Sequence, residues 1–303
     1  MNRAPALLLD TFSLFFRAFF ALPPMSTTRG AATNALYGFS ALLLKLLREH
    51  PGAELCFALD TRRPTFRHQE FSPYKSGRAL TPTPLAEQLG RLPQLLECIG
   101  GVALSSPGFE ADDVLATVAA KLREQGRPAL VVSGDRDLLQ LAYGSVQVHF
   151  VGRRGKDAVT YDEAAVRERF GVPPARLPSF VALVGDSSDN LPGVPGIGPA
   201  TAGKLLEGRE TVAELLRDAP SLKPARVGRQ LLEHAEQILH TERLARLRVD
   251  APLPPPPHLS SPSEESLLAW RQLFEALEFK SLVPRVDKLL ASRTRSEGPR
   301  QPK

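Results

Sequence analysis

Short apolar runs alternate with longer amphipathic segments over the first half of the chain. The apolar runs are residues 6–9, 54–59, 102–104, 129–132 and 146–151. The predicted helices between them are residues 13–22, 33–49, 85–100 and 138–142, with one more between the acidic stretch 110–113 and Gly126. Strands that alternate with helices predict an α/β domain with a mainly parallel sheet, in which residues 146–151 lie towards an edge.

Acidic residues follow four of these predicted strands. They are Asp10, Asp60, Asp135 and the group Glu110, Asp112 and Asp113, which opens a helix. Ligands of parallel α/β sheets bind beyond the carboxyl ends of the strands, so we expect these side chains to meet at one edge. Taken alone, the acidic stretch is more typical of a helix start, where carboxylates complement the helix dipole, than of a metal site, and the two roles are compatible.

The second half is predicted to be helical, with turns rich in glycine and proline. Helices are expected at residues 162–170, 212–216, 226–247 and 263–277, followed by a segment at 279–286 that packs back onto the core and a disordered basic tail at 291–303. A hairpin with Gly193, Gly196 and Gly198 leads to Thr201 and Lys204. Its backbone N–H groups and the following helix start could bind phosphate, although a plain tight turn is the alternative.

Composition and charge bear on the kind of binding partner and on the cellular compartment. The 303 residues carry a net charge of +5, which weakly favours a polyanionic partner. Basic and aromatic residues are interleaved in residues 61–83, which is either a solvated loop or a segment that follows a phosphate backbone. The sequence has no membrane-spanning apolar run and no export signal, so we expect a cytoplasmic protein. Cys56 and Cys98 are expected to be buried small hydrophobes.

The chemistry of the acidic cluster favours a hard cation. Carboxylate oxygens suit Mg²⁺ and Mn²⁺, and no histidine stands among the acids, which argues against zinc. The sequence therefore predicts a site for Mg²⁺ or Mn²⁺.

The ordered motifs resemble the 5′-nuclease (flap endonuclease) family, and within it the 5′→3′ exonuclease domain of bacterial DNA polymerase I. The resemblance extends from residue 7 to about 286. The motifs are Leu8-Leu9-Asp10, Phe57-Ala58-Leu59-Asp60, Phe66-Arg67-His68, Tyr74-Lys75-Ser76-Gly77-Arg78, Glu110-Ala111-Asp112-Asp113, Gly134-Asp135-Arg136-Asp137, Gly185-Asp186-Ser187-Ser188-Asp189-Asn190, Gly193-Val194-Pro195-Gly196-Ile197-Gly198 and Leu277-Glu278-Phe279-Lys280-Ser281-Leu282.

This resemblance implies a PIN-like fold with two parts. Residues 1–170 would form the catalytic α/β domain, with a helical arch around 62–95. Residues 171–290 would form a helical DNA-binding region, with a helix-three-turn-helix at about 178–206, and residues 291–303 would be the disordered tail.

The resemblance also implies roles for individual residues. The first metal group would be Asp10, Asp60, Glu110 and Asp112, with Asp113 beside them, and the second Asp135, Asp137, Asp186 and Asp189. Lys75 and Arg78 would face the scissile phosphate, and Arg17 and Arg67 would contact substrate phosphates. The DNA-gripping element would contain Gly193, Gly196, Ile197, Gly198, Thr201 and Lys204, with K⁺ as a possible ion at the hairpin.

The implied activity is 5′→3′ exonuclease and 5′-flap endonuclease hydrolysis of DNA by two metal ions. We expect a stand-alone monomer that acts on DNA flaps, nicks and 5′ ends, with RNA–DNA primer junctions as further candidate substrates. The alternatives are a PIN-like RNA-directed nuclease and a non-catalytic binder of DNA structures. The chain departs from the family pattern at Thr11, Phe16 and Gly134, where glycine, an aromatic hydroxyl and alanine are usual. These departures affect expected rate or substrate preference, since none removes an acidic side chain.

Overall fold

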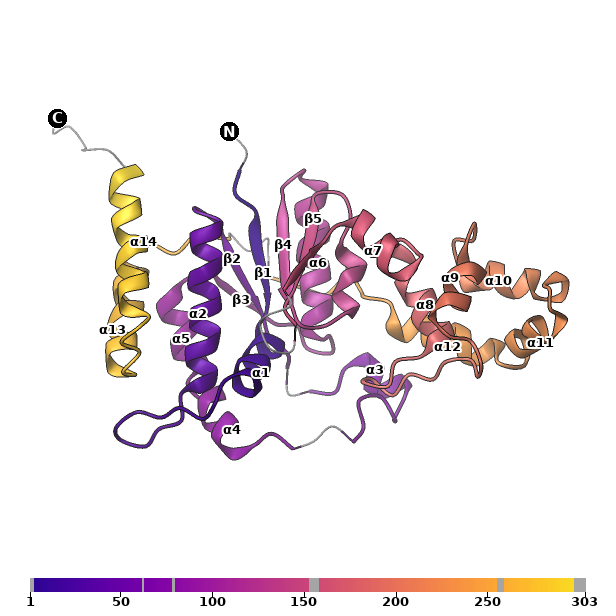
Figure 1. Cartoon of the computed structure of the whole chain (residues 1–303), viewed down its shortest axis with the longest axis horizontal. Coiled ribbons are helices and arrows are strands. Elements are labelled where there is room, and N and C mark those ends of the chain that lie inside the picture. The colour runs from indigo at the N-terminus through magenta and orange to yellow at the C-terminus, as the bar shows by residue number, and fades with distance from the viewer. Residues whose placement is uncertain (1–2, 62, 78–79, 153–157, 255–258, 297–303) are drawn as a thin grey trace.

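A six-stranded sheet forms the centre of the protein, which we describe from a computed structural model covering residues 3–61, 63–77, 80–152, 158–254 and 259–296. The strand order is β3-β2-β1-β4-β5-β6 (Figure 1). The strands are β1 (Ala6–Asp10), β2 (Leu55–Ala58), β3 (Val102–Leu104), β4 (Ala129–Ser133), β5 (Val146–Phe150) and β6 (Val159–Tyr161). All neighbours are parallel except β5 and β6, which confirms the predicted mainly parallel sheet. The outermost strand on that side is β6, which the sequence pattern did not predict.

The register of the sheet brings the acidic strand ends together. Central strand β1 pairs Asp10 with Ala58 of β2 and Leu9 with Val132 of β4. Asp60 and Asp135 each follow the end of their strand by two residues. Because the three strands run parallel, their carboxyl ends deliver these aspartates to one edge of the sheet.

Two apolar layers cover the sheet, as the alternation along β1 requires. Leu8 packs on the face covered by α6 (Ala111–Glu124), whereas Leu7 and Leu9 pack on the opposite face. That second face carries α1 (Thr11–Ala21), α2 (Asn34–Glu49) and α5 (Leu92–Ile99), with α13 (Glu264–Ala276) and α14 (Val283–Ser296) further out (Figure 1). Burial on both faces accounts for the nearly unbroken apolar runs of the central strands.

Two helices that the sequence predicted as continuous are each broken. The helix predicted at 85–100 is α4 (Thr83–Leu89) followed by α5, because Pro93 lacks an N–H and favours a first turn. The helix predicted at 226–247 is α11 (Ala225–Glu233) followed by α12 (Ala235–Ala245), with His234 outside the helical conformation between them.

Residues 291–296 are helical, in contrast to the disordered tail predicted from residue 291 onward. Helix α14 continues to Ser296, and Leu289 and Leu290 pack against the core cluster that includes α2. Apolar contact therefore extends the helix, and the prediction is wrong for residues 291–296. Residues 297–303 lie outside the described part of the chain.

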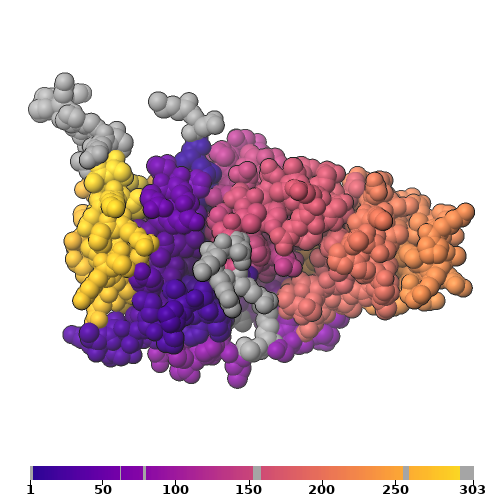
Figure 2. All heavy atoms as spheres, in the orientation of Figure 1, coloured from indigo at the N-terminus to yellow at the C-terminus, as the bar shows by residue number. Residues whose placement is uncertain are grey.

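Helices form the other end of the molecule, which is elongated in the space-filling view (Figure 2). These elements are α7 (Glu163–Phe170), η2 (Pro174–Arg176), α8 (Leu177–Val184), α9 (Pro199–Leu206), α10 (Val212–Asp218), η3 (Ala219–Ser221), α11 and α12. The short helix α3 (Phe66–Glu70) lies beside α12 (Figure 1), and η1 (Asp137–Leu141) follows β4 and packs against α6, β5 and α8. No helix in the described ranges is long and apolar enough to cross a membrane.

Candidate active site

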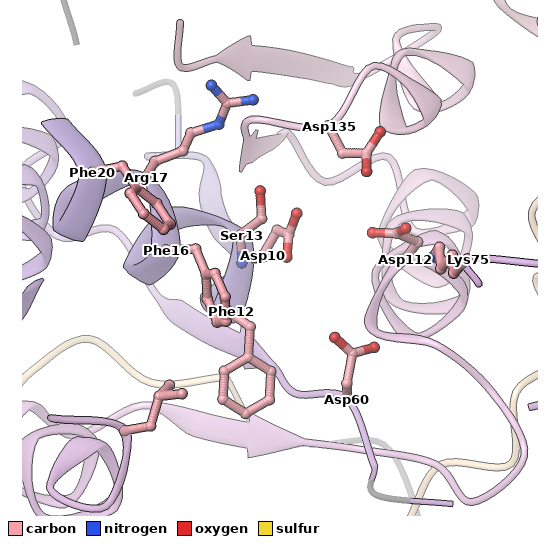
Figure 3. A pocket seen from close by; sticks show the side chains of 11 residues that line it. Asp10, Phe12, Ser13, Phe16, Arg17, Phe20, Asp60, Lys75, Asp112 and Asp135 are labelled. Carbon is pink, nitrogen blue, oxygen red and sulfur yellow. Dashed lines mark hydrogen bonds between the residues drawn. The ribbon is translucent and has the colours of Figure 1, made fainter. Parts of the chain in front are cut away.

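A pocket of about 810 Å³ opens at the carboxyl edge of the sheet and is lined by four carboxylates. Asp10, Asp60, Asp112 and Asp135 come from four separate segments and point into the same space (Figure 3). The rest of the wall is basic, hydroxylic or apolar. It consists of Phe12, Ser13, Phe16, Arg17, Phe20, Lys75 and Leu89.

Nearby backbone and hydroxyl donors fix the direction of two of these carboxylates. Asp10 is the N-cap of α1 and accepts a hydrogen bond from the backbone N–H of Ser13 at 3.4 Å, and the Ser133 hydroxyl donates to its other oxygen. Asp60 accepts from the N–H of Ala111 at 2.8 Å, at the first residue of α6. These contacts hold each carboxylate at a strand or helix end while leaving it on the pocket wall.

Burial and the crowding of the acids raise the pKa values of Asp10, Asp112 and Asp137. Burial, with added repulsion from Asp135 and Asp60, raises the pKa of Asp10 to about 7 although Ser133 partly opposes it. Burial and neighbouring carboxylates also raise the pKa values of Asp112 and Asp137 well above the ordinary range. A cluster of this kind requires either bound protons or added cations at neutral pH.

The pocket wall suits hard divalent cations, because its acidic side chains are all aspartates and offer carboxylate oxygens as metal ligands. Across the described ranges, no group of three or more His, Cys, Asp or Glu side chains forms a ready-made cage for one ion. The acids therefore face a shared pocket and do not converge on one point.

Glu110 and Asp113 differ sharply from Asp112, which lies between them in the sequence. Asp113 is fully buried, and its two oxygens accept four hydrogen bonds, two from Arg67 and one each from the backbone N–H groups of Glu110 and Arg248. The capping box between Glu110 and Asp113 starts α6, so the helix-start interpretation is confirmed for this pair. Asp113 has no oxygen left to offer, which corrects its assignment as a metal ligand.

Arg67 also has a different place from the one we predicted. It is 2% exposed, and its three nitrogens donate to Asp113, Glu110 and the carbonyls of Leu244 and Arg246. These partners use all five N–H donors of a guanidinium. Arg67 thus joins α3, α6 and the end of α12, and the prediction that it contacts substrate phosphate is wrong in this arrangement.

Lys75 and Tyr74 connect the two predicted metal groups. The Lys75 ammonium lies 2.8 Å from Glu110 Oε1 and 3.6 Å from Asp189 Oδ2. The Tyr74 hydroxyl lies 2.9 Å from Glu110 Oε2 and 2.8 Å from Asp189 Oδ2, so its single proton is shared between these two carboxylates. Burial lowers the pKa of Lys75, but the charges of Glu110 and Asp189 outweigh it and raise that pKa above its usual value. Sequence reasoning counted Tyr74 only among the aromatic residues of segment 61–83 and did not predict that it links the two groups of acids.

The remaining acids of the predicted second group lie beside the pocket and do not line it. Asp137 follows Asp135 and feels the charges of Asp135, Asp189 and Asp186. Asp186 accepts hydrogen bonds from the Ser188 N–H and hydroxyl at 2.7 and 2.6 Å. The structure therefore places these side chains near one another, but only Asp135 of this group is on the wall.

Arg17 lines the pocket and is folded against the loop after β4. Its guanidinium donates to the carbonyl of Gly134 and lies 5.5 Å from the ring centre of Phe150. A Cβ atom at residue 134 would coincide with this guanidinium, so the glycine makes room for it. Arg78, the second predicted arch residue, lies outside the described residues.

The glycine hairpin packs tightly at the end of α8. Gly193 leaves no space for a Cβ atom against the backbone of Val184. Gly198 is the N-cap of α9, and Thr201 and Lys204 are exposed on that helix. Ile197 is buried, so only its backbone can face a partner. The surface elements suit phosphate binding, while the Ile197 side chain serves the core.

Family models match two adjacent parts of the chain. The N-terminal resolvase-like domain of 5′-3′ exonuclease matches residues 5–171, and its C-terminal SAM fold matches residues 172–264. The chain belongs to the 5′-3′ exonuclease family. Together the two domains include the pocket and the glycine hairpin.

Curated relatives and solved structures agree with this assignment. DNA polymerase I of Bacillus caldotenax is 41% identical over 246 residues, covering 81% of this chain and 28% of that protein. Thermostable DNA polymerase I of Thermus filiformis is 38% identical over 296 residues, covering 98% and 35%. The chain spans about a third of the length of these relatives. The T5 5′-exonuclease with bound zinc has the same fold, with a TM-score of 0.65 at 18% identity over 95% of this chain and 97% of its own.

Proposed function

We propose that this protein is a structure-specific 5′→3′ exonuclease and 5′-flap endonuclease that hydrolyses phosphodiester bonds in DNA. The observation that carries the proposal is the pocket where Asp10, Asp60, Asp112 and Asp135 face Lys75 and Arg17. Carboxylates that hold cations, next to basic side chains that can bind phosphate, are what phosphodiester hydrolysis requires.

In this proposal the four carboxylates on the wall would hold Mg²⁺ or Mn²⁺, with Asp137, Asp186 and Asp189 as a second group beside them. Two such ions would activate a water molecule and stabilise the departing oxygen. Lys75 and Arg17 bind the non-bridging oxygens of the phosphate, and the hydrogen bonds that Ser13 and Ser133 donate to Asp10 keep that carboxylate in place. Arg78 would add a second cation from the arch.

The helical end of the molecule would bind the duplex. The exposed N–H groups around Gly196 and Gly198, with Thr201 and Lys204 on α9, fit the phosphate backbone on one side of a nick or flap. We keep K⁺ at the hairpin, RNA–DNA primer junctions as substrates, a monomeric state and a cytoplasmic location as parts of the proposal. The division at residue 170 into a catalytic and a DNA-binding part is a further part of it.

Cleavage of matched substrates tests this function against its two alternatives. A 5′-flap, a nicked duplex, a single strand and an RNA version of the flap strand are labelled and incubated with Mg²⁺ or with chelator. We expect the DNA flap and nick to be cut only with Mg²⁺. Preferential cutting of the RNA would favour an RNA-directed nuclease. Tight binding of the flap without cutting in either Mg²⁺ or Mn²⁺ would favour a non-catalytic binder.

A further inference from the structure

The Lys75 ammonium occupies a position inside the acidic cluster. It lies 2.8 Å from Glu110 and 3.6 Å from Asp189, and its side chain is only 13% exposed. It also lines the pocket together with Asp112. The chain therefore supplies its own cation to Asp189, one of the carboxylates that the proposed function gives to divalent ions, and to Glu110 beside it.

The backbone aims this side chain inward. Lys75 has a φ of 52°, and its N–H donates to the carbonyl of Asp189 at 3.2 Å. The Asn190 side chain donates to the carbonyls of Pro73 and Ser76 at 2.9 and 2.6 Å, which holds the turn around Lys75. A left-handed conformation is costly for a lysine, so the contacts from residues 189–190 maintain it.

The oxygens of Glu110 are already in use. Oε1 accepts from Lys75, and Oε2 accepts from Tyr74 at 2.9 Å and from Arg67 at 3.1 Å. These contacts take up three of the roughly four lone pairs of the carboxylate, and an ion that approaches Oε1 meets the positive charge of Lys75. Arg67 is tied to four other acceptor atoms and Tyr74 is 4% exposed, whereas Lys75 has a flexible stem on the pocket wall.

We infer that Lys75 competes with divalent cations for Glu110 and thereby sets the affinity of the pocket for them. The inference rests on the proposed function only in taking the pocket as a divalent-ion site.

The competition has a consequence for substrate binding, because a DNA phosphate that draws Lys75 away leaves Glu110 open to the ion. DNA and the ion then bind with positive coupling that passes through this lysine.

Direct Mn²⁺ titration, followed by the electron paramagnetic resonance of free Mn²⁺, tests the competition without any cleavage. Lys75→Met removes the charge and keeps the length, and we expect it to bind Mn²⁺ about tenfold more tightly than the wild type. Lys75→Gln serves as a second variant in case the first does not fold. Lys45→Met, at an exposed position on α2, is the control and should match the wild type. Unchanged or weaker Mn²⁺ binding by both Lys75 variants would overturn the inference.

A second titration measures the coupling to DNA. A 5′-flap with phosphorothioate linkages across the junction resists hydrolysis during the measurement. We expect it to tighten Mn²⁺ binding by the wild type severalfold and to have a much smaller effect on Lys75→Met. An equal effect on both proteins would contradict a coupling through Lys75. Absence of cleavage by the wild type would count against the nuclease proposal alone, since neither titration depends on turnover.

Discussion

The two terminal nitrogens of Arg67 donate hydrogen bonds to the two carboxylate oxygens of Asp113, at 2.7 and 2.8 Å. Both side chains of this ion pair are buried. The same guanidinium donates to the carbonyls of Leu244 and Arg246 at the carboxyl end of α12, in the helical end of the molecule. The ion pair between Arg67 and Asp113 therefore joins helix α6 to the helical end of the molecule, which we propose binds duplex DNA. Its importance lies in holding these parts together, since neither side chain faces the pocket.

Loss of this pair should destabilise the protein strongly. Arg67→Ala leaves Asp113 as a buried charge without its partner, and we expect about 3–5 kcal/mol lower free energy of unfolding in urea. Arg243→Ala is the matched control, because Arg243 also joins α12 to α3 through exposed Glu70 and should cost about 0–1 kcal/mol. A stable Arg67→Ala protein with a flatter salt dependence of DNA binding would instead indicate the phosphate contact that we rejected.

Neighbouring Asp112 and Asp113 should respond differently to the same change. Asp112→Asn alters a carboxylate on the pocket wall, and we expect Mg²⁺-dependent cleavage to fall by at least about 100-fold. Asp113→Asn should lower stability. Below the melting temperature of this variant, the Mg²⁺ concentration that gives half-maximal rate should stay within about threefold of the wild-type value. A large rise in that Mg²⁺ concentration for Asp113→Asn would restore Asp113 as a metal ligand.

Gly134 should control the position of Arg17. Its backbone does not require the left-handed region, so alanine is conformationally acceptable, and the added methyl group mainly displaces the guanidinium. We expect Gly134→Ala and Arg17→Ala each to weaken flap binding about 3- to 10-fold and to reduce the slope of log affinity against log salt by about one. The double variant should be no worse than Arg17→Ala alone. Additive losses in the double variant would show that the two residues act separately.

The raised acid pKa values predict a specific pH dependence of stability. Because the folded-state pKa of Asp10 is about 7, against an ordinary 3.8, the folded protein binds more protons than the unfolded chain between these values. This group therefore stabilises the metal-free protein fully at low pH, and its contribution is lost as pH rises towards 7 and beyond. Mg²⁺ needs deprotonated ligands, so the rise in melting temperature on adding Mg²⁺ should grow from pH 5 to pH 8. Asp10→Asn should flatten this growth, and an Mg²⁺ effect that is independent of pH would refute the account.

Much of the sheet and the approach of the acids could be predicted from the sequence. Short apolar runs ending in Asp10 and Asp60 are enough to predict parallel strands with carboxylates at one edge. The break between α4 and α5 could have been predicted from Pro93, which favours a first helical turn, whereas no proline or glycine marks the break at His234. The role of Asp113 was partly predictable, because consecutive helical residues point about 100° apart and Asp112 and Asp113 therefore face different directions. Its pairing with Arg67, distant in sequence, required the folded structure.

The most direct test of the central claim compares the wild type with Asp135→Asn on one labelled 5′-flap. Single-turnover cleavage is measured in Mg²⁺, and flap binding is measured in parallel by fluorescence anisotropy without divalent ions. We predict that the variant binds the flap within about threefold of the wild type and loses Mg²⁺-dependent cleavage by several orders of magnitude. Undiminished cleavage by Asp135→Asn would contradict the assignment of the carboxylate pocket as the catalytic centre.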